Sequence, residues 1–196
     1  MPMPQRPPSA PFPIAGGTVV PPENAINPHV KLGAQYWRSL CAARRFPARS
    51  DLTLRGMAAI LPFAVILSVI DGGADFEYRY VGEAQRQAFK TSFKGLRVSQ
   101  IEAAVPQLGG LLRGAYEHAR SLGMPFVIRG RVDHEPTDSK LLYHESVFLP
   151  LGVSDAAVDH LLIVGVQIPE PFWDISTDGL TRLAAGTSSA VAATAR

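Results

Sequence analysis

The sequence predicts an α+β fold, a five-stranded antiparallel sheet with helices on one face and an additional N-terminal helix. Two β-prone runs flank the segment 71–75, whose glycines and aspartates are typical of a tight reversal. The longest helical apolar repeat follows in Pro106–Leu122. Three more β-prone runs come after it, so a helical crossover separates two groups of antiparallel strands.

Composition limits the classes of protein to which the chain can belong. It has 196 residues, of which 46% are hydrophobic, enough for one ordinary domain with tails. Its 19 basic and 17 acidic residues are interspersed, without the concentrated basic face of a nucleic-acid-binding protein. No apolar run is long enough to span a bilayer, and the proline-interrupted N-terminus lacks the continuous apolar core of a signal peptide. We therefore expect a cytoplasmic protein that neither binds nucleic acid nor inserts into membranes.

Three regions are expected along the chain. Residues 1–27 hold eight prolines and few charges, a composition typical of a disordered leader. Residues 28–173 carry the periodic segments and form the predicted domain. Residues 174–196 are small and polar, which predicts a flexible tail.

The first predicted helix occupies residues 28–45. Asn27 and Pro28 form a typical helix start, with Asn as the N-cap. This helix lies across the domain or pairs with its copy in a dimer. We predict a homodimer whose contact is an apolar stripe on the helix, made by Val30, Trp37 and Leu40.

The hairpin around residues 71–75 is the predicted centre of the sheet. Its first run, 63–70, is almost wholly apolar, as in a strand buried on both faces. Its second run alternates, which places Phe76, Tyr78 and Tyr80 on one face. The first strand is expected to pair with the last strand of the chain, and the second to lie at the sheet edge.

The remaining elements follow from local signals. Short helices are predicted over 53–60, 83–89 and 99–104, and strands over 126–132, 141–149 and 160–167. In the long helix Pro106–Leu122, Gly109 and Gly110 each cost about 1 kcal/mol relative to alanine. A backbone that must come close to a neighbour is one reason for such a cost. Gly123 is the expected C-terminal stop.

Five short sequence motifs follow one another along the chain: Tyr-Trp-Arg-Ser-Leu at 36–40, Leu-Pro at 61–62, Phe-Glu-Tyr-Arg-Tyr-Val-Gly at 76–82, Gly-Leu at 95–96 and Leu-Pro-Leu at 149–151. In this order they resemble those of a subfamily of small, often stand-alone bacterial PAS proteins. The resemblance covers about residues 29–170 and implies a sensory module, with a pocket between sheet and helices and a surface for docking or dimerisation. Since no output segment is expected after the module, output is expected through a signalling partner such as a sensor kinase.

The candidate site is an apolar pocket for a small apolar or aromatic ligand. The alternative, that the same side chains fill a dry core, stays open. The predicted wall consists of Tyr78, Tyr80, Phe89, Leu111, Leu112, Ala115, Phe126, Ile128 and Phe148.

No cofactor is expected. Cys41 is the only cysteine; it precedes the hairpin and lacks the sequence context of covalent flavin or thioester photosensors. His118, on the long helix, is an outside candidate for haem ligation. The functional alternative is a small enzyme, metal-dependent or not, that uses the His, Asp and Glu side chains at 133–135, 144–145 and 159–160.

Overall fold

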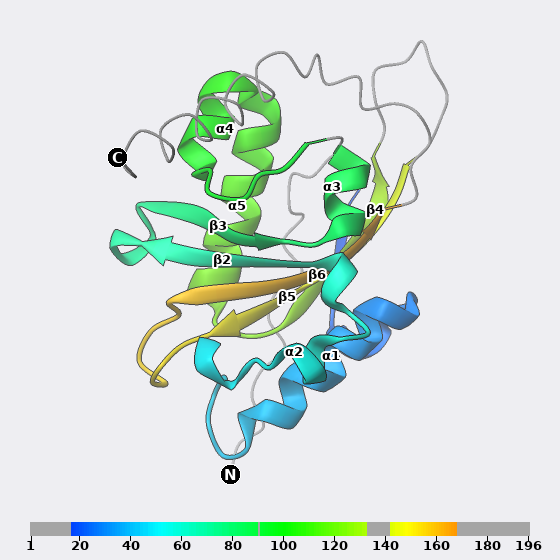
Figure 1. Cartoon of the computed structure of the whole chain (residues 1–196), viewed down its shortest axis with the longest axis vertical. Helices are drawn as coiled ribbons and strands as arrows, with labels where there is room; N and C mark the ends of the chain where they lie inside the picture. Colours follow the sequence, from blue (N-terminus) through cyan, green and yellow to red (C-terminus); the bar gives the residue numbers. More distant parts are fainter. Residues whose placement is uncertain (1–16, 90, 133–141, 168–196) are drawn as a thin grey trace, which may run out of the picture.

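The computed structural model describes residues 17–89, 91–132 and 142–167. Its centre is a six-stranded antiparallel sheet in the order β1-β4-β5-β6-β2-β3 (Figure 1). The α+β class is confirmed, whereas the predicted number of five strands is wrong. The strands are β1 (Gly17–Val20), β2 (Ala64–Ile70), β3 (Asp75–Val81), β4 (Phe126–Val132), β5 (Leu142–Leu151) and β6 (His160–Gln167).

Helices cover both faces of this sheet, not one (Figure 1). One apolar cluster joins α4 and α5 to the sheet, and a second joins α1 to the opposite face. The helices are α1 (Pro28–Cys41), α2 (Leu54–Met57), α3 (Glu83–Phe89), α4 (Val98–Ala104) and α5 (Pro106–Leu122), with single turns η1 (Pro22–Asn24), η2 (Arg49–Asp51), η3 (Leu61–Phe63) and η4 (Asp71–Gly73).

The additional strand, β1, comes from the segment that was expected to belong to the disordered leader. Gly17 pairs with Gly130 and Val20 with Val127 along the edge of β4. Thr18, Val19 and Val20 are β-branched and favour a strand, but a run of four residues followed by two prolines is too short to predict one. The strand forms because it pairs with the edge of β4. The expectation of a disordered leader is therefore wrong from residue 17 onward. The predicted tail, 174–196, lies outside the described residues.

Helix α1 lies across the sheet. Asn27 caps it as predicted, since its Oδ1 accepts a hydrogen bond of 2.9 Å from the backbone N–H of His29. An added Cβ at Gly33 would lie 2.8 Å from Val164 Cγ2, so the helix rests directly on β6. Trp37 Nε1 donates a buried 2.7 Å hydrogen bond to the carbonyl oxygen of Pro150.

This placement corrects the predicted dimer contact. Val30 and Trp37 are buried against the chain's own sheet, and Leu40 packs against the same cluster. The stripe is therefore not a free surface for a second copy. Helical periodicity identifies an apolar face but does not say what covers it. The helix also ends at Cys41 rather than at residue 45, with Ala42 at φ 48°.

The hairpin has the predicted place in the sheet: β2 lies between β3 and β6, and β3 is at the edge of the described sheet. A β-bulge interrupts the pairing, because Ile66 faces Tyr80 while Leu67 faces Tyr78. Arg79 is the extra residue, so the alternation of faces restarts after it. Tyr80 consequently packs on the α1 side, where its hydroxyl donates to the carbonyl oxygen of Leu61 at 3.1 Å. The prediction that it shares a face with Tyr78 is wrong.

Helix α5 has the predicted bounds. It ends at Gly123, whose φ of 57° is the left-handed conformation expected of a C-cap glycine. Near its start, Gly109 lies against the backbone of Glu102 in α4, whereas nothing lies within 4 Å of a Cβ at Gly110. The close approach expected of this glycine pair therefore applies to Gly109 alone. None of the helices in the described ranges combines the length and the apolar character that crossing a bilayer requires.

Candidate functional site

A cavity of about 140 Å³ lies between α5 and the sheet. Its size is close to that of an engineered protein cavity of about 150 Å³ that binds benzene. Strands β2, β3, β5 and β6 and helices α3 and α5 supply most of its wall. The lining residues are Val65, Tyr78, Val81, Gln85, Phe89, Phe93, Leu108, Leu111, Leu112, Ala115, Tyr116, His144, Ser146, Phe148, Ile163 and Gln167.

The predicted wall is brought together in large part. Six of its residues line the cavity, and they are Tyr78, Phe89, Leu111, Leu112, Ala115 and Phe148. Phe126 does not line the cavity but lies behind Phe148, and the two rings stack at 4.9 Å between centroids. Ile128 is buried in the same cluster without reaching the cavity. Tyr80 lies on the other face of the sheet, as described above.

Two buried tyrosines form the first of two polar groups in the wall of the cavity. Tyr78 comes from β3 and Tyr116 from α5, and their hydroxyl oxygens lie 2.7 Å apart. Both side chains are almost fully buried, at 2% and 5% exposed. Burial raises the pKa of each hydroxyl well above its ordinary value. The pair is therefore neutral at physiological pH.

The two hydroxyls of this pair contain one more donor than their shared hydrogen bond uses. Two hydroxyl groups carry two protons, and a single bond between them uses one. Neither oxygen has another hydrogen-bond partner among the described residues. One hydroxyl proton is therefore available to an acceptor inside the cavity.

A second polar group is built from β5 and α3. His144 Nε2 and Ser146 Oγ are 2.9 Å apart. The amide nitrogen of Gln85 donates to the carbonyl oxygens of Gly165 at 2.6 Å and Phe63 at 3.1 Å. Both of its N–H groups are thus used by the backbone. Gln85 Oε1 accepts no hydrogen bond from the described residues and remains available to a donor.

His144 is held neutral. Its burial lowers the pKa of the imidazole to about 4, although the neighbouring carboxylate of Glu145 acts in the opposite direction. Glu145 itself points to the other face of the sheet, where it accepts backbone hydrogen bonds from Ile26 and Asn27. Consecutive residues of a strand face opposite ways, which is why these two do not form a joint site.

The sheet register separates the two polar groups. Ser146 lies opposite Gly165, whereas Tyr78 lies in the row of Leu67 and Leu161. Gly165 and Leu161 are four positions apart on β6, which corresponds to roughly 13 Å of strand. The row between them is apolar and contains Val65, Phe148 and Ile163. The cavity is thus polar toward both ends and apolar in the middle.

Sequence reasoning missed Tyr116, Gln85, His144 and Ser146 as wall residues. Tyr116 directly follows Ala115 of the predicted apolar stripe, and that position was its only signal. His144 and Ser146 lie two residues apart on β5, a spacing that places them on one face of the strand. Nothing local marks Gln85, because its role depends on carbonyl groups far away in the chain.

The candidates for haem and metal binding lie elsewhere. The His118 ring contacts the edge of Phe126 at 4.9 Å between centroids, and it does not line the cavity. His160 pairs with Asp159 at 2.7 Å, at the end of β6 opposite to Gln167, the residue that faces His144. In the ranges that the structure describes, no three His, Cys, Asp or Glu side chains are grouped as metal ligands would be. Residues 133–135 lie outside those ranges.

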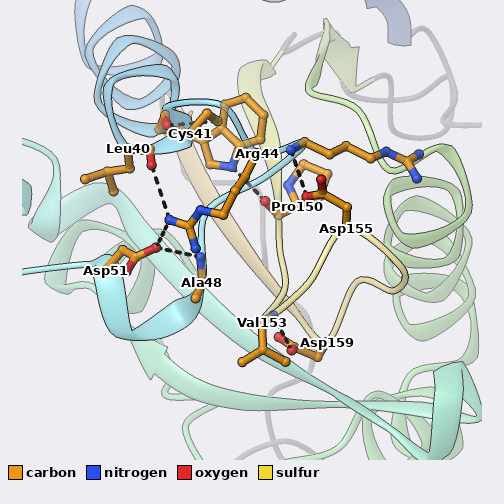
Figure 2. A network of polar contacts seen from close by, with 11 residues as sticks. Leu40, Cys41, Arg44, Ala48, Asp51, Pro150, Val153, Asp155 and Asp159 are labelled. Carbon is orange, nitrogen blue, oxygen red and sulfur yellow. Dashed lines mark hydrogen bonds and ion pairs between the residues drawn. The ribbon is translucent and has the colours of Figure 1, made fainter.

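The charged residues near the end of α1 form a different kind of network (Figure 2). Arg44 contacts Asp51 at 2.5 Å, and Asp51 also accepts the backbone N–H of Ala48 at 2.8 Å. These two contacts lower the pKa of Asp51. Asp155 accepts the backbone N–H of Arg45 at 2.8 Å. The network joins the turn after α1 to the loop between β5 and β6, and we assign it a structural role.

Comparison with known proteins finds no family model, no curated protein and no solved structure that matches this chain.

Proposed function

We propose that this chain is a PAS-type sensory or adaptor module, which binds a small molecule in the cavity and passes the signal to a partner. The observation that carries the proposal is the cavity itself, apolar in the middle and equipped with polar groups that the protein leaves partly unpaired. A purely structural core would be expected to pair or exclude such groups. The cavity therefore has the character of a binding site.

Three further observations agree with the proposal. The short sequence motifs described above lie in the order that the PAS resemblance requires. The first hairpin strand, β2, lies between its hairpin partner and the last described strand, β6, as the sequence predicted. Helix α5 supplies Leu111, Leu112 and Ala115 of the predicted wall and Tyr116 of the tyrosine pair.

That the module signals through a partner protein is likewise a proposal. A sensor kinase is the type of protein through which such a module would act. Homodimer formation also stays a prediction, now without the stripe on α1, which the chain's own sheet covers. A dimer would have to use a different surface.

Ligand binding is tested directly. The purified protein is extracted with organic solvent for mass spectrometry, and thermal shifts are measured against fatty acids, aromatic compounds and nucleotides. We expect a co-purified compound or a shift with the aromatic set. Absence of both would refute the ligand-binding half of the proposal and leave only partner docking.

A cavity-filling variant makes this test specific. Ala115→Leu adds three carbon atoms inside the cavity and should abolish any shift, because 140 Å³ leaves no room for both side chain and ligand. The matched control is Ala103→Leu, on an exposed position of α4. It makes the same chemical change outside the site and should keep the shift.

A further inference from the structure

We propose that the ligand of this cavity is an electrically neutral molecule of single-ring size that carries a hydrogen-bond acceptor, and that this acceptor receives the spare hydroxyl proton of Tyr78 and Tyr116. This inference rests on the proposed function, because it specifies what the cavity binds. Its basis is an unused hydroxyl donor beside an apolar wall in which the described residues include no Lys, Arg, Asp or Glu.

The donor is the first step. The hydroxyls of Tyr78 and Tyr116 share one hydrogen bond, and the second proton has no acceptor among the described residues. A buried donor without a partner is unfavourable. A carbonyl or ether oxygen of a ligand would satisfy it. An apolar ligand of the same shape would displace any solvent from the hydroxyl and supply nothing in return.

The charge of the ligand follows from the wall. No Lys, Arg, Asp or Glu is among the described residues that line the cavity. The guanidinium of Arg113 on α5 is already engaged by Glu102 at 2.8 Å and Asp75 at 3.6 Å. A carboxylate or an ammonium group would therefore be buried without a counter-charge, which is strongly unfavourable.

The size of the ligand follows from the volume. A cavity of about 140 Å³ accepts a molecule near the size of benzene. The flat rings of Phe89, Phe93 and Phe148 in the wall favour an aromatic ring by stacking and edge contacts. Gln85 Oε1, which has no donor of its own among the described residues, would accept a hydroxyl group on the far side of such a ring.

Three probes of nine heavy atoms separate these requirements. Acetophenone has the ring and an acceptor, cumene replaces the carbonyl oxygen with a methyl group, and benzoate adds a negative charge. Dissociation constants are measured at pH 7.5 by NMR titration of the full chain. We expect acetophenone to bind about five- to tenfold more tightly than cumene, as one neutral hydrogen bond allows. Benzoate should bind at least tenfold more weakly than acetophenone.

The double variant Tyr78→Phe/Tyr116→Phe is the decisive control. It removes both hydroxyls and keeps both rings, so it leaves no unpaired group and should preserve the fold. A single variant is unsuitable because the remaining hydroxyl could still donate to the ligand. In the double variant, acetophenone and cumene should bind with equal affinity. An unchanged preference, or benzoate binding equal to that of acetophenone, would overturn the inference.

The two proposals fail in different ways. If cumene binds to the wild type and not to Ala115→Leu, the cavity is a binding site whatever the acetophenone result. Equal affinities of the wild type for acetophenone and cumene would then overturn only the role of the tyrosine pair. If none of the three probes binds, both the ligand class and ligand binding in this cavity are refuted.

Discussion

Glu145 is a carboxylate at a fully buried position, and it forms no salt bridge with the residues that the structure describes. Its two oxygens accept the backbone N–H groups of Ile26 at 2.8 Å and Asn27 at 2.6 Å. Asn27 is the N-cap of α1, so the negative charge lies near the positive end of that helix. This single side chain fixes where the N-terminal segment crosses the sheet.

Replacement of Glu145 should therefore be costly. Glu145→Ala removes the acceptor of both N–H groups at a fully buried position, and we expect a loss of about 3 kcal/mol in the free energy of unfolding. Glu145→Gln keeps one acceptor and should lose about half as much. The measurement is urea unfolding followed by Trp37 fluorescence in a Trp173→Phe background. Glu117→Ala, at an exposed position of α5, is the matched control and should change stability by less than about 0.5 kcal/mol. Equal stability of the two alanine variants would contradict this role.

The crossing of α4 and α5 shows how one element positions another. Arg113 of α5 donates to Glu102 of α4 at 2.8 Å and lies 3.6 Å from Asp75 at the start of β3. Asp75 in turn accepts the hydroxyl of Ser99 at 2.5 Å. These contacts fix the helix that carries Leu111, Leu112 and Ala115 of the predicted pocket wall. The close contact of Gly109 with Glu102 sets the distance between the two helices.

Two adjacent glycines provide a matched test of this crossing. Gly109→Ala places a methyl group against the Glu102 backbone, which cannot move aside as a flexible side chain would. We expect it to lower the free energy of unfolding by about 2 kcal/mol. Gly110→Ala has open space around its Cβ and should raise it by up to about 1 kcal/mol through helix propensity. Thermal and urea unfolding of both variants measure the difference. The same sign for both would show that the helices can separate without cost.

At the scale of the whole molecule, buried titratable groups link stability to pH. His144 has a pKa of about 4 in the fold, against 6.5 for a free imidazole. Between these values the unfolded chain binds a proton that the folded chain does not, so acidification favours unfolding. The pKa of Asp75 is lowered, because hydrogen bonds from Ser99 and Phe76 outweigh the opposing effect of burial. The stability that Asp75 contributes is present above its unfolded pKa and is lost as pH falls through its folded value.

The predicted profile has a distinct window. Stability should fall by at most about 3 kcal/mol from pH 7 to pH 4 through His144, with a further decline at lower pH through Asp75. Urea unfolding at pH 7.5, 5.5 and 4.5 measures the first part. His144→Gln removes the titrating group and should flatten the profile in this window. Parallel profiles of wild type and variant would show that His144 does not control it.

Much of the fold could be predicted from local features of the sequence. Asn27 and Pro28 start α1, Gly123 ends α5, and the segment 71–75 reverses the hairpin where each was expected. These features depend on caps, turns and periodicity within a few residues, so a single sequence is sufficient to identify them. The nearly unbroken apolar character of residues 63–70 likewise predicted a central strand.

The candidate site, too, could be predicted from the sequence only in part. Its apolar wall could be anticipated from helical spacing, as Leu111, Leu112 and Ala115 illustrate. Its polar groups could not, because the pairing of Tyr78 with Tyr116 joins positions 38 residues apart. No local sequence pattern indicates that these two residues are in contact. The amide of Gln85 is engaged by carbonyl groups that are likewise remote in the chain.

The sequence by itself determined the α+β class, the order of the predicted elements and six residues of the cavity wall, since these follow from short-range chemistry. Only the tertiary structure decided three other features. β1 forms on the edge of β4, the bulge at Arg79 turns Tyr80 away from the cavity, and the sheet covers the Val30 and Trp37 stripe. The physical reason is common to all three. Periodicity states which faces are apolar, whereas long-range pairing and packing decide which surface covers each of them.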